Sequence, residues 1–266
     1  MDFALNQRTV SGLDYAGFLD MATSLGCIGV EPRTDLGRPV FDGLPPAEAG
    51  RMARDRGLRL LGLSEVYPFD DWTDERRDAV RALIGMAEAA GAETISLIPR
   101  VDGGGPNPPD PDFHAAILGK VLELCDGTSV VPLVEPIGFP GCSLRLQRHA
   151  AAAIERFGAG GRVGLVHDTF QHALAGDTEM FVPHIRIVHI SGFSGTGDLS
   201  QDDDGRRVML DESDRTGAVG QIRALIAAGY GGAFSFETTD PAIPARPDLH
   251  EALAASMAHI RAEIDR

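Results

Sequence analysis

Residues 163–168 read Val-Gly-Leu-Val-His-Asp, a short apolar run that ends in two ionisable residues. Runs of this kind recur along the chain, and each is followed by a turn and a longer amphipathic segment, which is typical of alternating strands and helices. The apolar runs predict eight strands, at residues 3–6, 27–31, 58–63, 94–98, 130–135, 163–167, 185–190 and 233–237. The amphipathic segments predict eight helices, at residues 13–25, 45–56, 74–90, 111–124, 144–157, 174–181, 218–228 and 249–264.

This alternation predicts the fold class. Eight strand and helix pairs in 266 residues indicate an α/β protein, a (β/α)8 TIM barrel that forms a single domain over residues 1–266. A doubly wound open sheet is the alternative, but Asn6-Gln-Arg-Thr9 after the first strand is not the glycine-rich phosphate turn expected there. Two long loops, residues 102–111 and 191–214, would lie at the C-terminal end of the barrel, where active sites form.

Composition excludes several classes of partner. The formal net charge of -15 argues against nucleic acid and anionic membranes, because proteins that bind them need a basic surface. The three cysteines have no C-x-x-C spacing, so they predict neither a disulfide framework nor a zinc ribbon and fit a reducing, cytoplasmic location. The first residues have no basic segment followed by an apolar one, and no apolar run reaches membrane-spanning length, so we expect neither a secretory signal nor a membrane span. Whether the chain forms a homo-oligomer is left open.

Four polar residues stand at the ends of four consecutive predicted strands: Glu135, Asp168, His189 and Glu237. Any one of them alone is more often a helix cap, but four at matching positions would bring three carboxylates and one imidazole together at the barrel mouth. Three carboxylates do not cluster in their charged form without a cation. The sequence therefore predicts one divalent metal ion, and this mixed set of ligands suits Mn²⁺, Zn²⁺, Mg²⁺ or Co²⁺.

The two histidines near Asp168 are expected to have other roles. His167 precedes Asp168 in the strand, so alternation turns it toward the layer between barrel and helices, where it would be a buried structural histidine. His172 lies in the following segment and would either cap the helix or line the mouth. The sequence has no Walker A, H-E-x-x-H or G-x-S-x-G motif, so nucleotide, zincin and esterase interpretations lack their usual support.

The segment Glu135-Pro-Ile-Gly-Phe-Pro-Gly-Cys142 resembles the xylose isomerase-like TIM-barrel family of sugar isomerases and epimerases. Less specific matches cover nearly the whole chain, at Leu5-Asn6, Gly29-Val-Glu-Pro-Arg33, Gly164-Leu-Val-His-Asp-Thr-Phe170, Val188-His-Ile-Ser191 and Phe234-Ser-Phe-Glu237. The resemblance implies that Glu135, Asp168, His189 and Glu237 bind one divalent ion. It also implies that Glu135 and Glu237 act as acid and base.

The resemblance further implies a small polyol or keto-sugar substrate, and the chain is most similar to members that interconvert cyclic keto-inositols through an enediolate. The residues implied to contact the substrate are Asn6, Glu31, Gln171, His172 and Arg207. Two departures concern the substrate rather than the metal. The family often has histidine where this chain has Gln171, and a Pro-Gly-x-Gly turn where it has Leu210-Asp-Glu-Ser213.

Other functions remain open at this level. A ketose 3-epimerase or a hydroxypyruvate isomerase would use the same four ligands. A DNA repair enzyme similar to endonuclease IV shares the barrel, but it needs further ligands for three zinc ions and a basic groove, which this acidic chain does not offer. A different class is a catalytically silent barrel that only binds a ligand or partner.

Overall fold

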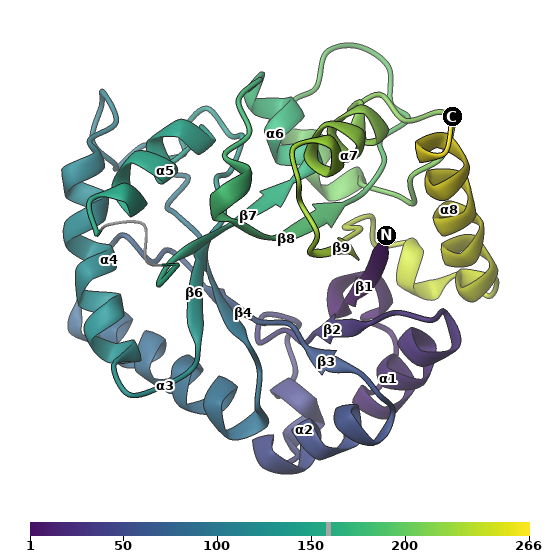
Figure 1. Cartoon of the computed structure of the whole chain (residues 1–266), viewed down its shortest axis with the longest axis horizontal. Coiled ribbons are helices and arrows are strands. Elements are labelled where there is room, and N and C mark those ends of the chain that lie inside the picture. Colours follow the sequence, from purple (N-terminus) through teal and green to yellow (C-terminus); the bar gives the residue numbers. More distant parts are fainter. Residues whose placement is uncertain (158–160) are drawn as a thin grey trace.

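The strands follow one another around a ring, and the helices lie outside it, as Figure 1 shows for the computed structural model. The structure describes residues 1–157 and 161–266. The strands are β1 (Asp2–Asn6), β2 (Gly29–Glu31), β3 (Arg59–Leu60), β4 (Leu63–Val66), β5 (Thr94–Leu97), β6 (Val131–Val134), β7 (Gly164–Asp168), β8 (Ile185–Ile190) and β9 (Ala233–Phe236). The paired strands are parallel, and the first pairs with the last, with Phe3 opposite Phe234. The predicted TIM barrel is confirmed.

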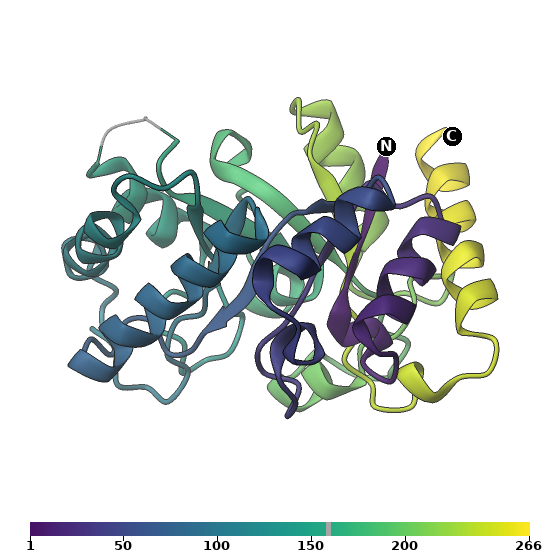
Figure 2. The same cartoon turned by 90° about the horizontal axis from the view of Figure 1, so that it is seen from below.

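The helices cover the outside of the ring in chain order. They are α1 (Tyr15–Ser24), α2 (Pro46–Asp55), α3 (Asp74–Ala90), α4 (Pro111–Cys125), α5 (Gln147–Glu155), α6 (Thr169–Ala175), α7 (Ala218–Ala227) and α8 (Leu249–Ile264). In Figure 2 the N-terminus lies at the upper edge, and β1 runs downward from it. Because all strands are parallel, the loops that follow them gather at the lower edge, which is the mouth of the barrel.

One predicted helix was wrong. The segment expected at residues 174–181 is helical earlier, because the Asp168 side chain caps α6 and accepts a hydrogen bond from the Gln171 backbone N–H at 2.9 Å. Gly176 then ends the helix in the left-handed conformation, with φ of 63°. The cap places Asp168 at the junction of β7 and α6, at the mouth.

The predicted third strand is divided into two pieces. β3 pairs with β2 and β4 pairs with β5, so the two pieces together complete the ring. Between them, the Thr94 hydroxyl donates a hydrogen bond to the Leu61 carbonyl at 2.7 Å and takes the place of a backbone donor. A Cβ atom at Gly62 would lie 2.6 Å from that hydroxyl oxygen, so the close approach requires glycine.

Two apolar layers support the mouth. The larger lies between the strands and the surrounding helices, and the smaller fills the barrel interior with Ala4, Leu61, Leu133, Val166, Ile187 and Ala233. Along β7 the side chains alternate, so that Leu165 belongs to the outer layer and Val166 to the inner one. The same alternation turns His167 outward and Asp168 inward, directly above the interior layer.

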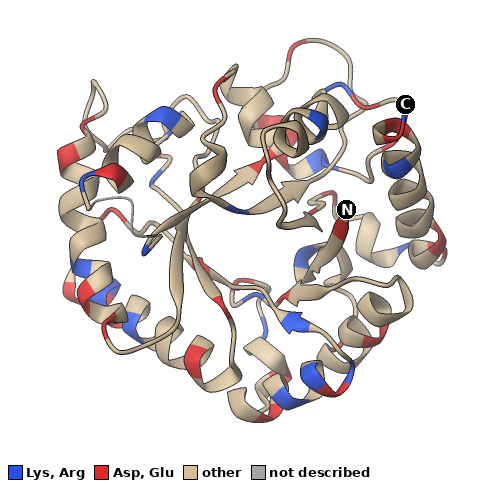
Figure 3. Cartoon of the chain, viewed as in Figure 1, with Lys and Arg blue, Asp and Glu red and all other residues tan. Residues whose placement is uncertain are grey.

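Charged residues lie mainly on the outer helices and loops, and few of them lie in the strands (Figure 3). Within residues 1–157 and 161–266, no helix combines the length and apolar character needed to cross a bilayer. The carboxylates buried at the strand ends are therefore exceptions to the general pattern, and they distinguish the mouth from the rest of the barrel.

Candidate metal centre

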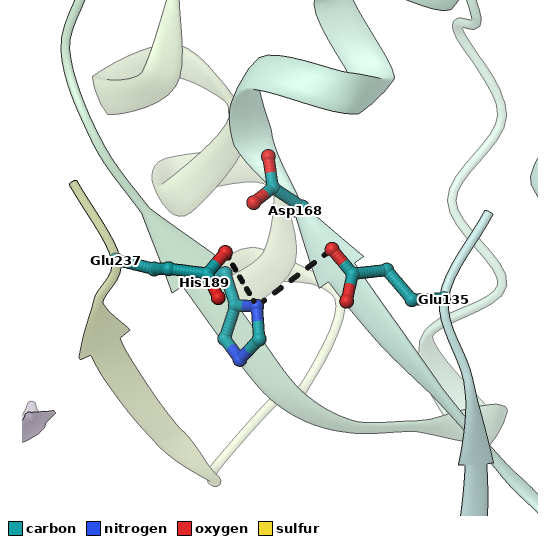
Figure 4. A group of neighbouring side chains, drawn as sticks. All are labelled: Glu135, Asp168, His189 and Glu237. Atoms are coloured by element: carbon teal, nitrogen blue, oxygen red, sulfur yellow. Dashed lines mark ion pairs between the residues drawn. The ribbon is translucent and has the colours of Figure 1, made fainter. Parts of the chain in front are cut away.

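Four side chains converge at the mouth, each from the end of a neighbouring strand (Figure 4). Glu135 follows β6, Asp168 ends β7, His189 lies in β8 and Glu237 follows β9. These strands are consecutive and parallel, and Asp168 lies opposite His189 in the register, so their ends meet at one place. Each residue offers one ligand atom, the four atoms lie within 4.8 Å of one another, and all four residues are buried.

The His189 ring is held in one orientation. Its Nε2 lies 3.2 Å from Glu31 Oε2, so an Nε2–H group donates to that carboxylate. Its Nδ1 faces the cluster, 3.2 Å from Glu237 Oε2 and 3.8 Å from Glu135 Oε1 (Figure 4). This Nδ1 is buried and has no hydrogen-bond partner in the described part of the chain. A ring nitrogen directed at three carboxylates, with the other ring nitrogen fixed by an acid, is the arrangement of a metal-binding histidine.

Two buried guanidinium groups also touch the cluster. Arg207 Nη2 donates to Asp168 Oδ2 at 2.5 Å and to Glu237 Oε2 at 3.3 Å. Arg33 Nη1 donates to Glu237 Oε1 at 2.7 Å. The cluster therefore contains positive charge from the protein itself, since both guanidinium groups contact Glu237 and Arg207 also contacts Asp168.

The pKa values show how the cluster responds without a bound cation. Burial raises the pKa of Glu135, and it raises the pKa of Asp168 to about 7 in spite of the Arg207 guanidinium. Burial lowers the pKa of His189, but the carboxylates of Glu237 and Glu31 outweigh it and raise that pKa well above its usual value. Burial also disfavours charge on Glu237, but His189, Arg33 and Arg207 outweigh it and lower its pKa well below the usual range. Bound protons therefore reduce the negative charge of the cluster, as a divalent ion would.

These residues fit one divalent ion. They offer three carboxylate oxygens and one imidazole nitrogen in a single buried cluster, and the unpartnered Nδ1 already points into it. Mg²⁺ and Mn²⁺ accept such oxygen-rich sets, and Zn²⁺ and Co²⁺ accept mixed oxygen and nitrogen sets. The cluster could therefore hold Mn²⁺, Zn²⁺, Mg²⁺ or Co²⁺.

A cavity of about 400 Å³ lies over the cluster. Glu135 and Glu237 form part of its lining, together with Gln171 and Arg207, two of the residues predicted to contact the substrate. Gln171 also links two segments of the wall, because its Oε1 accepts from the Gly138 N–H at 3.0 Å and its Nε2 donates to Asp204 Oδ1 at 2.7 Å.

The other three predicted substrate contacts lie away from this lining. The Asn6 side chain is buried and accepts from the Arg8 backbone N–H at 3.0 Å. Glu31 lies behind His189, and the His172 ring packs against the His167 ring with 4.7 Å between centroids. Their contact with a substrate stays a prediction, and Glu31 has a structural contact of its own, with the His189 ring.

His167 has the structural role that the strand alternation predicts. It is wholly buried, and its two ring nitrogens contact the side chains of Gln147, at 2.5 Å, and Gln221, at 2.9 Å. These amides come from α5 and α7, so the ring joins the barrel to its helices. Burial lowers the pKa of His167 to about 3, which keeps the ring neutral.

Several residues of the mouth have no assigned role in the sequence prediction. Arg33 is the clearest, although it belongs to the Glu-Pro-Arg sequence that begins at the last residue of β2. The cavity also has an apolar side that comes from loops after several strands, formed by Tyr67, Ile98, Val101, Ile137 and Phe139. The position of Arg33 close to a strand-end glutamate was a signal in the sequence that could have identified it. No such signal exists for the apolar side of the cavity, because loop packing does not follow strand periodicity.

Comparison with known proteins agrees with this architecture. The sequence profile described as Xylose isomerase-like TIM barrel matches residues 19–263. A xylose isomerase domain-containing protein from Salmonella typhimurium LT2 superposes with a TM-score of 0.90 at 25% identity, covering 99% of this chain and 97% of that one. No match is found among curated proteins.

Two more distant structures share the fold. The IolI protein, solved with a bound zinc atom, has a TM-score of 0.84 at 16% identity and covers 100% of this chain and 98% of that one. D-psicose 3-epimerase from Clostridium cellulolyticum H10, solved with D-tagatose, has a TM-score of 0.73 at 13% identity, with 99% of each chain covered.

Proposed function

Because the chain belongs to the xylose isomerase-like TIM barrel family, we propose that it is a divalent-metal-dependent isomerase of cyclic keto-inositols, with 2-keto-myo-inositol (scyllo-inosose) as the substrate of choice. The observation that carries the proposal is the buried set of Glu135, Asp168, His189 and Glu237 below a cavity at the barrel mouth. The zinc atom in the similar IolI structure supports a metal in this kind of site.

The proposed reaction moves a proton between adjacent carbons of an α-hydroxyketone. A divalent ion held by Glu135, Asp168, His189 and Glu237 would supply Lewis acidity, which would favour negative charge on the substrate oxygens. The carboxylates of Glu135 and Glu237 both line the cavity, so each can reach a substrate lying across the floor. One removes the proton from the hydroxyl-bearing carbon beside the carbonyl, and the other returns a proton to the former carbonyl carbon. The hydroxyl proton passes to the former carbonyl oxygen, so the ketone and the alcohol exchange places. The cluster itself is buried, which keeps water away from the carbanion.

The charges at the mouth favour a neutral substrate. Three arginines line the cavity: Arg8, Arg33 and Arg207. Each is already paired with carboxylates of the protein, Arg8 with Asp35, Arg33 with Asp35, Glu65 and Glu237, and Arg207 with Asp168, Asp204 and Glu237. A substrate carboxylate or phosphate would have to displace one of these pairs. Hydroxypyruvate, which is an anion, is therefore a poorer candidate than a keto-inositol.

The shape of the cavity favours a ring. Its floor is polar, whereas one side is apolar and includes Ile98, Val101, Ile137 and Phe139. A six-membered ring whose hydroxyls are all equatorial has a polar rim and two faces made of C–H groups. Such a ring can place two rim oxygens at the floor while one face packs against the apolar side. An open-chain ketose has no comparable flat apolar face.

The second candidate is a ketose 3-epimerase. The similar D-psicose 3-epimerase, solved with D-tagatose, supports it, as does an L-ribulose 3-epimerase with a TM-score of 0.72 at 19% identity. The same two glutamates would remove and return the proton at one carbon. The apolar side of the cavity is the reason for ranking the keto-inositol first.

Turnover of scyllo-inosose, D-tagatose and hydroxypyruvate by protein loaded with Mn²⁺ or Zn²⁺ separates these functions. We expect kcat/KM to be highest for scyllo-inosose and lowest for hydroxypyruvate. Preference for D-tagatose would replace the proposal with the epimerase. Elemental analysis of protein purified without added metal tests the alternative that the chain is a catalytically silent barrel. Absence of any divalent ion, together with no turnover of the three substrates after metal loading, would make the protein a binding barrel.

A further inference from the structure

Arg33 joins Glu237 of the metal centre to carboxylates at the rim of the mouth. Its side chain is only 5% exposed. Its Nη1 donates to Glu237 Oε1 at 2.7 Å, and its Nη2 donates to Glu65 Oε2 at 2.7 Å. Asp35 holds the other edge of the guanidinium, where it accepts from Nε at 2.7 Å and from Nη2 at 3.0 Å. One planar group is thus fixed by three carboxylates.

The barrel scaffold sets the position of this guanidinium. Arg33 follows β2 closely, and its backbone N–H donates to Gln7 Oε1 at 2.9 Å. A parallel bridge pairs Arg33 with Ser64 in β4. The Asp35 contact is bidentate, which restricts rotation of the fork as well as its position. Arg33 therefore presents Nη1 to Glu237 from a rigid frame.

The contact between Arg33 and Glu237 gives the two carboxylate oxygens of Glu237 different surroundings. Oε1 is bound by Arg33, whereas Oε2 is turned toward His189 Nδ1, at 3.2 Å, and toward Arg207. Glu135 differs, since no arginine contacts its carboxylate in the described residues. The two glutamates, which look equivalent in the sequence, are held very differently.

We propose that Arg33 is a positioning residue that fixes Glu237 with Oε2 directed at the metal position, so that Glu237 is the static glutamate of the site and Glu135 the one free to turn. The inference rests on the proposed function. Arg33 does not contact the four-residue cluster except through Glu237, so its effect on a bound ion passes through that side chain.

The test is a calorimetric titration of metal-free full-length protein with Zn²⁺ and with Mn²⁺. Residues that hydrogen-bond to metal ligands typically contribute about 10–100-fold to metal affinity, so we expect Arg33→Met to weaken metal binding by a factor in that range. Arg33→Lys should not restore the affinity, because one ammonium group cannot hold Asp35 and Glu237 in a fixed fork. In the proposed reaction, both variants should lower kcat more than they raise KM.

Two further variants keep the test decisive. Asp35→Asn loosens the guanidinium without touching a metal ligand, so it should weaken binding in the same direction but less than Arg33→Met. The double variant should bind like Arg33→Met alone, because Asp35 acts through Arg33. Arg59→Met is the matched control, since Arg59 is a half-exposed arginine paired with Glu93 outside the mouth cavity. Its metal affinity should equal that of the wild type.

Unchanged affinity in Arg33→Met would overturn the inference, and so would full recovery in Arg33→Lys, because charge alone would then suffice. If Arg33→Met does not fold, unchanged affinity in Asp35→Asn overturns it. Wild-type protein that binds the ion but converts none of the candidate substrates would remove the proposed function and leave the role of Arg33 intact. Wild-type protein that binds no divalent ion would remove both.

Discussion

Replacing Asp168 by asparagine should change how the stability of the metal-free protein depends on pH. Burial raises the pKa of Asp168 to about 7 from an ordinary value of 3.8. The folded state therefore holds this proton more tightly than the unfolded state. The resulting stability is fully present below pH 3.8, declines as the pH rises, and is lost above about pH 7. The amide side chain of the variant stays neutral and has no such decline.

The size of the effect follows from the shift. Each pH unit between the two pKa values removes about 1.4 kcal/mol, so about 2–3 kcal/mol is lost between pH 5 and pH 7. For a domain of this size that corresponds to a fall in Tm of about 5–10 °C. The variant also changes the contact between residue 168 and Arg207, which shifts its Tm independently of this proton, so the slope of Tm with pH is the informative quantity.

The assay is thermal unfolding of chelator-treated protein from pH 5 to pH 8, with and without added Zn²⁺. Wild-type Tm should fall with pH relative to Asp168→Asn, and added Zn²⁺ should remove the fall in the wild type only, because the ion binds the ionised carboxylate. Glu93→Gln, at a 44% exposed side chain, is the control and should follow the wild type. Parallel pH profiles for wild type and Asp168→Asn would refute the reasoning.

Two other substitutions test the packing around the site. In Gly50→Ala the new Cβ would lie 1.9 Å from the Ala90 carbonyl oxygen, a backbone atom that cannot move aside, so the free energy of unfolding should fall by about 1–3 kcal/mol or more. Gly85→Ala, at an open position in the middle of α3, should raise the free energy of unfolding by about 0.5–1 kcal/mol. Urea unfolding of the two variants measures both changes. An unchanged stability of Gly50→Ala would contradict the close contact between Gly50 and Ala90. His167→Leu leaves the Gln147 amide without its partner, so it should lower stability by about 1–3 kcal/mol and leave Zn²⁺ affinity unchanged, whereas a lost Zn²⁺ site would mean that His167 is not merely structural.

Much of the fold was predictable because the barrel repeats one local pattern. Each apolar run followed by an amphipathic segment indicates one strand and helix unit, and the parallel closure of eight such units follows from general rules. The convergence of Glu135, Asp168, His189 and Glu237 was predictable for the same reason, since equivalent ends of neighbouring parallel strands meet at one edge.

The failures come from interactions that the local pattern does not contain. The early start of α6 depends on the Asp168 side chain acting as a cap, and the break in the third strand depends on a hydroxyl of Thr94 in the neighbouring strand. The role of Arg33 depends on Glu65 and Glu237, which lie in two distant segments, as well as on nearby Asp35. Such contacts appear only when the chain is folded, because periodicity describes each strand but not the loops that meet above it.

Hydrogen exchange at carbon tests the central claim most directly. Metal-loaded wild-type protein in D₂O should place deuterium on the carbon beside the carbonyl of scyllo-inosose, as followed by NMR. Chelator-treated protein and the Glu135→Gln variant should both reduce this exchange to the rate seen without protein. Exchange that persists in the chelator-treated protein, or its absence from the metal-loaded wild type, would contradict a metal-dependent proton transfer at this site.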